Sequence, residues 1–231
     1  VENPNMKHAE GKDIQAWLDF DATDGNPIVM RVATSAVDVE GAKKNLAAEL
    51  NDFDFDALAA KTYQQWNDEL NRIQINTVVN EEDKDIFYTS LYHCFVVPNL
   101  YSDVDGRYRA HDKKVYQSDR PRYTVFSLWD TFRTEHPLLT LIQRERSIDI
   151  INTFINNYET GGLLPVWELA ANETNCMIGY HAIPVIADAY FCGLEGIDYE
   201  KALEAMVKTA REDQFGLSCY KEYGFIPANC E

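Results

Sequence analysis

The sequence predicts a mainly α-helical protein in which long helices alternate with polar loops. After Val37, apolar residues recur with helical spacing over most of the chain, and several of these stretches begin with a capping residue. Only the first part of the chain shows the period-two alternation of strands. The long loops between helices favour an array of helical hairpins or an α/α toroid over a bundle with short connections.

Two strands are expected at the start of the chain. Apolar and polar residues alternate from Asp13 to about Val37, on either side of the turn sequence DGNP at residues 24–27. Because two strands alone are marginally stable in water, this pair needs a partner sheet.

Helical periodicity predicts seven helices after the strands, with Asp54 and Asp198 as N-caps. The last helix is expected to face inward with Ala202, Leu203, Met206 and Val207. The predicted helices run from Glu40 to Leu50, from Asp54 to Ile73, from Glu81 to before Pro98, from Leu128 to Leu141, from Arg144 to Tyr158, from Ala182 to Cys192 and from Asp198 to Glu212.

Two long irregular segments, 99–127 and 163–179, separate these helices. Loops of this length in compact domains are usually functional or disordered, so both are candidates for carrying function.

The composition excludes several classes of function. Of 231 residues, 38 are Asp or Glu and 21 are Lys or Arg, which gives a formal net charge of -17. A chain this acidic has no electrostatic footprint for nucleic acid or for anionic lipid. No apolar stretch approaches the roughly 18 residues of a transmembrane helix. The abundance of carboxylates and aromatic rings suits a polar, uncharged ligand.

The five cysteines are odd in number and lack CxxC spacing, which disfavours a disulfide framework or a zinc ribbon. We expect mostly free thiols, with one disulfide if the compartment is oxidising.

The first chemical motif lies in the stretch Leu128–Pro137. Trp129 offers an apolar ring face to a pyranose, while Asp130 and Arg133 can accept from and donate to hydroxyl groups. The alternative is structural, because Asp130 and Arg133 share a helix face and can form an intrahelical ion pair.

The second motif lies in the stretch Leu164–His181. It holds a second adjacent Trp–Glu pair, Trp167 and Glu168, followed by Glu173 and by His181 at the start of a helix. The alternative is a capping loop whose Asn and Glu side chains satisfy helix-end amides.

Other chemistries find little support in the sequence. It contains no HExxH, GxSxG, P-loop or GxGxxG motif, and its histidines lie on separate segments. A pair of carboxylates acting as acid and base on a glycosidic bond stays open, with Asp130 and Glu168 as the pair of a complete small glycosidase.

Three strings of the sequence carry a resemblance to one family. They are SLWDTFRTEHPLLTL at Ser127–Leu141, GGLLPVWELAANETNCMIGYHAIPVIADAY at Gly161–Tyr190 and GLEGIDYEKAL at Gly193–Leu203. In these strings the chain resembles glycoside hydrolase family 92, the calcium-dependent exo-α-mannosidases common in gut Bacteroidetes.

The resemblance implies a fold that extends beyond this chain. Residues 1–37 resemble the last strands of an N-terminal β-sandwich domain, 38–80 a helical linker, and 81–231 the first half of an (α/α)6 catalytic barrel. The exposed faces of a half-barrel lead us to expect self-association.

The resemblance also implies a function, the removal of terminal α-mannose from glycans by an inverting, calcium-dependent mechanism. The strings that carry the acid, the calcium ligands and the base in the family (EGNxWQY-like, GNEP-like and DDCGQMSAW-like) are not found in this sequence. We therefore expect no catalytic or metal-binding residue in this segment and no turnover by it alone. The family's setting implies a periplasmic, cell-surface or secreted location in a Gram-negative bacterium.

The residues matching the family are expected to bind mannose-containing glycans and not to catalyse. Asp130 resembles the residue that holds hydroxyls of the terminal mannose, with Trp129 and Arg133 as its supports. The cleft wall is expected to be shaped by Trp167, Glu168, Glu173, Met177 and His181. The alternative from another class is a stand-alone carbohydrate-binding or helical interaction module without catalysis.

Overall fold

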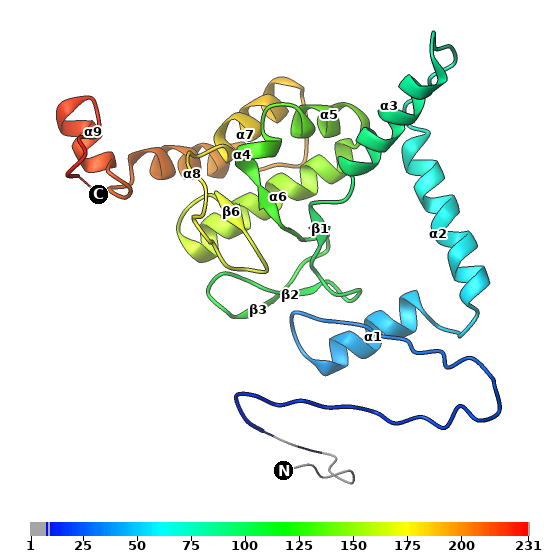
Figure 1. The fold of residues 1–231 in the computed structure, drawn as a ribbon. Coiled ribbons are helices and arrows are strands. Elements are labelled where there is room, and N and C mark those ends of the chain that lie inside the picture. Colours follow the sequence, from blue (N-terminus) through cyan, green and yellow to red (C-terminus); the bar gives the residue numbers. More distant parts are fainter. Residues whose placement is uncertain (1–7, 9, 231) are drawn as a thin grey trace. The chain divides into compact units, whose positions relative to one another are not determined.

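The computed structural model of the protein describes residue 8 and residues 10–230 (Figure 1). By compactness the chain divides into a short N-terminal unit that ends at Val32 and a larger unit that begins at Ala33. The described residues are mainly helical, as the sequence predicts, and their strands are short. No described helix combines the length and apolar character that crossing a membrane requires.

The predicted strands between Asp13 and Val37 are not formed. The turn is present, since the Gly25 amide donates to the Ala22 carbonyl over 3.1 Å, but no strand flanks it in the described residues. Apolar side chains such as Leu18 are exposed along this segment. The physical reason is that no third strand is available in the described N-terminal unit to pair with either half.

The first three helices begin at polar caps. Asp54 accepts from the Ala57 amide over 2.9 Å, as predicted, while Asp38 and Asn80 cap the helices on either side. The third helix ends at His93, before Pro98. These helices are α1 (Val39–Glu49), α2 (Phe55–Leu70) and α3 (Glu81–His93).

A buried carboxylate attaches α1 to the rest of its unit. Asp103, 5% exposed, accepts from Ser35 Oγ over 2.7 Å and from Asn45 Nδ2 over 2.8 Å. Gly41 is the only buried residue of α1, and a side chain there would collide with the Asp103 carboxylate. Contacts to α1 are therefore mainly polar.

The segment 99–127, predicted to be irregular, contains five short strands. All three pairings in the described residues are antiparallel: β1 with β4, β2 with β3, and β5 with β6. The strands are β1 (Asn99–Leu100), β2 (Arg107–Arg109), β3 (Val115–Gln117), β4 (Tyr123–Thr124), β5 (Phe126–Ser127) and β6 (Trp167–Glu168).

The predicted helix from Leu128 to Leu141 is two helices. The break falls at Phe132–Thr134, because Pro137 lacks the N–H that a continuous helix would bond to the residue-133 carbonyl. Proline is tolerated in the first turn of a new helix, and that is where Pro137 lies. The two helices are α4 (Leu128–Thr131) and α5 (Glu135–Ile142).

Helix α6 (Arg144–Gly161) is the centre of the hydrophobic core. Ile150, Ile151 and Phe154 are at most 1% exposed, and α5, α7 (Ala182–Phe191) and α8 (Tyr199–Arg211) all contact this helix. Figure 1 shows α5 and α7 on the same side of α6. Gly162 ends α6 in the left-handed region, with φ of 94°.

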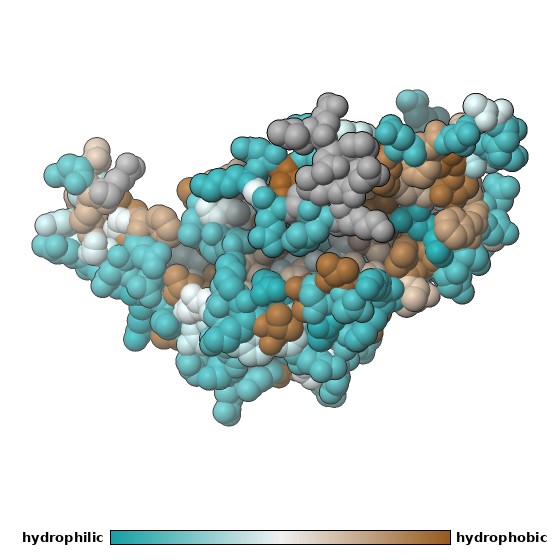
Figure 2. Space-filling view, turned by 90° about the horizontal axis from the view of Figure 1, so that it is seen from below, coloured by the Kyte–Doolittle hydropathy of each residue, from teal (hydrophilic) through white to brown (hydrophobic). Residues whose placement is uncertain are grey.

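Helix α8 corrects one prediction about its inward face. Ala202 is buried and Met206 partly buried, but Leu203 and Val207 are 57% and 41% exposed. The small residues Ala202 and Ala205 face the core with Met206 beside them, and Leu203 and Val207 lie outside. Figure 2 shows hydrophobic residues exposed among hydrophilic ones on the face that it draws.

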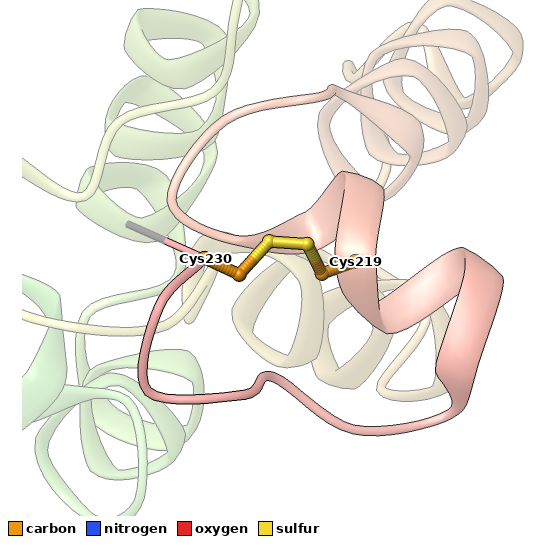
Figure 3. The surroundings of a disulfide bond; sticks show 2 residues. All are labelled: Cys219 and Cys230. Carbon is orange, nitrogen blue, oxygen red and sulfur yellow. A yellow bond between two sulfur atoms is a disulfide. The ribbon is translucent and has the colours of Figure 1, made fainter.

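Helix α9 (Leu217–Tyr223) was not predicted. It is tied to the following segment by the Cys219–Cys230 disulfide (Figure 3). Cys94, Cys176 and Cys192 are free.

Two phenylalanines at opposite extremes of burial test the position of the core. Phe154→Ala should lower the free energy of unfolding by about 3–5 kcal/mol, because the ring is fully buried and meets Phe126 edge to face. Phe191→Ala, at a position 83% exposed, should change it by less than about 0.5 kcal/mol. Urea unfolding measures both, and equal effects would contradict this placement of the core.

Candidate functional site

The pairing of β5 with β6 brings together the two Trp–acid motifs, which are Trp129–Asp130 and Trp167–Glu168 with their flanking residues. Phe126 lies opposite Glu168, and Ser127 lies opposite Trp167. Helix α4 begins directly after β5, so Trp129 and Asp130 follow the same strand pair. The two motifs, which are far apart in the sequence, thus form one region of the structure.

Three aromatic rings, which we call the aromatic group, connect the motifs further. The His181 ring stacks on Phe132 with 4.2 Å between centroids and 14° between planes, and the Trp129 ring lies 6.1 Å from His181. The Arg133 guanidinium carbon lies 5.4 Å from the centre of the Phe132 ring, a cation–π geometry. Trp129, 41% exposed, keeps ring surface free for a ligand.

Burial and charge both favour the neutral form of His181. Burial lowers its pKa, and the nearby Arg133 cation lowers it further. The Nε2 atom is buried and has no hydrogen-bond partner among the described residues. A neutral imidazole has one donor and one acceptor nitrogen, which suits an alcohol hydroxyl.

Asp130 is exposed and has an oriented carboxylate. Ser127 Oγ donates to its Oδ2 over 2.5 Å, which fixes the side chain at the start of α4. In the described part of the chain no ion pair joins Asp130 to Arg133, so the structural alternative for this pair is not realised. The second carboxylate oxygen and the Arg133 head group are available for other partners.

Glu168 and Glu173 bind backbone amides of their own neighbourhood. Glu168, only 2% exposed, accepts from the Ala171 amide over 2.7 Å and from Thr124 Oγ1 over 2.9 Å. Glu173 accepts from Trp167 and from two further amides, so it shapes the loop as a cap does. Burial removes Glu168 from reach of a ligand, and an Asp130–Glu168 catalytic pair is therefore not formed.

The remaining predicted residues lie in the 163–179 loop. Trp167 is half-buried in β6, and Met177 is 44% exposed. The ring contacts thus join Trp129, Phe132, Arg133 and His181.

Two residues near the candidate site, Phe132 and Glu135, were not predicted from the sequence. Phe132 lies three residues after Trp129, a spacing that places both on one helix face and could have indicated it. Burial raises the pKa of Glu135 to about 7, and its Oε1 atom has no partner among the described residues. Nothing in the local sequence signals that burial.

No metal centre is formed by this chain as far as it is described. Among residue 8 and residues 10–230, no three His, Cys, Asp or Glu side chains gather where they could hold a metal ion. The residues present do not fit the calcium ion that the family resemblance implies, and we assign no calcium chemistry to them.

Gly179 is the residue on which the placement of His181 depends. A Cβ on Gly179 would lie 2.5 Å from His181 Nε2, and its φ is +85°. Gly179→Ala should therefore displace the imidazole and destabilise the fold by more than the roughly 1–2 kcal/mol cost of a left-handed alanine.

Gly162→Ala is the matched control, because Gly162 also has positive φ but nothing within 4 Å of a Cβ. Thermal unfolding and the NMR signal of the His181 ring measure the two effects. An unmoved His181 signal in Gly179→Ala would contradict the contact.

Glu135 should make stability depend on pH. The unfolded carboxyl ionises near its ordinary value of 4.5 and the folded one near 7, so the free energy of unfolding falls as pH rises between these values. Glu135→Gln removes this loss. The melting temperature of the variant minus that of the native protein should therefore rise from pH 4.5 to 7 and stay constant above pH 7.

Thermal melts across this pH range measure the difference, with the exposed Glu195→Gln as control. A difference between Glu135→Gln and the native protein that does not change with pH would contradict the burial of this carboxyl.

Comparison with known proteins identifies the chain's relatives. The family model described as the glycosyl hydrolase family 92 catalytic domain matches residues 41–231. No sequence among curated proteins matches.

Solved structures give close matches. A family 92 α-mannosidase from Bacteroides thetaiotaomicron is 40% identical, with a TM-score of 0.78 over 84% of this chain and 26% of that one. The same enzyme in complex with mannoimidazole matches equally. A family 92 inverting mannosidase from the same organism is 31% identical, with a TM-score of 0.76 over 84% of this chain and 28% of its own.

The chain therefore spans little more than a quarter of the length of the solved structures it matches. The family match covers most of the chain and includes both Trp–acid motifs. This chain belongs to glycoside hydrolase family 92.

Proposed function

We propose that this chain is part of an α-mannosidase that removes terminal α-mannose from glycans with inversion. Family membership carries the proposal, and it is supported by the names of the relatives, one an inverting mannosidase and one solved with mannoimidazole. An acidic chain with exposed rings and carboxylates is consistent with a neutral, hydroxyl-rich ligand.

The aromatic group and its neighbours are the binding residues in this proposal. Trp129 stacks on the apolar face of the sugar, Asp130 accepts from its hydroxyls, and Arg133 and His181 donate to them. Trp167 and Met177 line the wall nearby.

The acid, the base and the calcium ligands lie outside this chain in this proposal. The sequence strings that carry them in the family are not found here, and the described residues form no metal site. Since the matched relatives are far longer, the segment supplies binding groups to a larger enzyme and is inactive alone.

The proposed architecture follows the family. Residues 1–37 end a β-sandwich domain, 38–80 form a helical linker and 81–231 form half of an (α/α)6 barrel. Exposed apolar side chains on α8, Leu203 and Val207, support self-association of the isolated chain.

A periplasmic, cell-surface or secreted location in a Gram-negative bacterium fits the disulfide between Cys219 and Cys230. Disulfides persist in oxidising compartments and are rare in the cytosol.

Hydrolysis of α-1,2-mannobiose tests the proposal. The full-length protein should release mannose with inversion in the presence of calcium, and this chain alone should not. Asp130→Asn in the full-length protein should lower kcat/KM about tenfold or more, since a hydrogen bond to a charged group contributes about 1.5–3 kcal/mol.

Asp119→Asn, an exposed site outside both motifs, is the control. Efficient turnover by the chain alone would contradict the location of the catalytic residues. A chain that binds mannose as tightly as the full-length protein would favour a stand-alone carbohydrate-binding module.

A further inference from the structure

Three residues with left-handed backbone lie around one buried carboxylate. Val125, Ala170 and Ala171 have φ values of 67°, 48° and 58°. None is glycine, and Val125 is β-branched, which makes this conformation especially unfavourable. Such backbone persists only where its surroundings over-determine it, and it concentrates at functional sites.

The backbone amides of all three residues donate hydrogen bonds to Glu168 or Thr124. One Glu168 oxygen accepts from the Val125 amide over 3.2 Å, and the other accepts from the Ala171 amide over 2.7 Å. The Thr124 hydroxyl donates to Glu168 over 2.9 Å and accepts from the Ala170 amide over 2.7 Å. One carboxylate and one hydroxyl thus hold two separate segments of the chain.

This arrangement requires both carboxylate oxygens of Glu168 to accept hydrogen bonds. Glu168 is 2% exposed, and each of its oxygens faces at least one donor. A glutamine has one carbonyl oxygen, so its NH2 group would face either the Val125 amide or the Ala171 amide, donor against donor. Glutamine would therefore release one of the two segments.

Both segments lead directly into the proposed binding residues. Val125 precedes β5, whose Ser127 orients Asp130, and Glu168 itself follows Trp167 in β6. A shift of backbone at Val125 therefore moves Asp130 and Trp129, which are a few residues further along the chain.

We propose that Glu168 is a positioning residue, whose buried carboxylate locks the left-handed residues of two loops and thereby sets where Trp129, Asp130 and Trp167 meet the terminal sugar. It acts through these residues and does not itself touch the substrate, since burial and its existing partners leave it no free acceptor at the surface. The inference rests on the proposed mannoside-binding function.

Glu168→Gln in the full-length protein tests this role, with kcat and KM on an aryl α-mannoside and hydrogen–deuterium exchange as readouts. We expect KM to rise and kcat/KM to fall about tenfold or more, because small misplacements of binding groups are costly. Exchange should become faster in segments 124–131 and 166–172.

Asp103→Asn is the matched control, because Asp103 is also a buried carboxylate, 5% exposed, and its side-chain partners Ser35 and Asn45 belong to neither motif. It should leave kcat/KM within about twofold of the native value, whatever it does to melting temperature. Equal losses of kcat/KM in both variants would reduce Glu168 to a general structural role and overturn the proposal.

Glycine supplies a rescue that a general structural role does not predict. Glycine adopts positive φ without steric cost, so replacing Ala170 and Ala171 by glycine in the Glu168→Gln protein should restore part of kcat/KM. A kcat/KM of Glu168→Gln close to the native value, or no rescue, would overturn the positioning role.

The exchange measurement separates this inference from the proposed function. If the native full-length protein does not cleave mannosides, the proposed function fails, and exchange alone then decides the positioning role. Faster exchange confined to the two segments supports it, and unchanged exchange overturns it.

Discussion

The burial of α6 is the constraint on which the rest of the larger unit depends. A helix with side chains such as Ile150, Ile151 and Phe154 removed from water on several sides needs partners on each of them. Helices α5, α7 and α8 are those partners. The loops that join these helices then emerge at fixed places, and among them are the segments that carry both Trp–acid motifs.

Polar interactions add precision where the helices themselves do not reach. The β5–β6 pairing is only two residues long on each side, and Glu168, which is one of them, accepts hydrogen bonds from donors in both segments. Breaking one such buried hydrogen bond costs free energy, because the remaining donor or acceptor is left without a partner and without access to water. The region of the aromatic group is therefore supported both by the hydrophobic core around α6 and by the buried hydrogen bonds of Glu168, and few alternative conformations are open to it.

Local signals in the sequence predicted most helices, and tertiary contacts explain part of what was missed. The N-caps Asp54 and Asp198 accept hydrogen bonds from amides three residues further along the chain, so they can be predicted from the neighbouring sequence. The break before Pro137 was missed, although proline chemistry is local too. The stacking of Phe132 on His181 joins residues far apart in the chain, and no periodicity could reveal it.

The residues of the candidate site were proposed from the sequence, and their binding roles stay predictions. Trp129, Asp130 and Arg133 lie at an exposed surface, as binding residues must, whereas Glu168 is buried. An acidic residue beside tryptophan looks the same in sequence whether it faces ligand or backbone. The half-barrel and sandwich arrangement came from family resemblance and stays a prediction.

The attachment of α1 has a consequence for how this sequence can vary. Apolar cores tolerate exchange among Leu, Ile and Met because their contacts lack direction. The contacts of Asp103 with Ser35 and Asn45 are directional, and Gly41 leaves no space for a side chain. Among homologues, a change at one of Ser35, Gly41, Asn45 and Asp103 should therefore be accompanied by changes at the others. The exposed residues of α1 should vary independently.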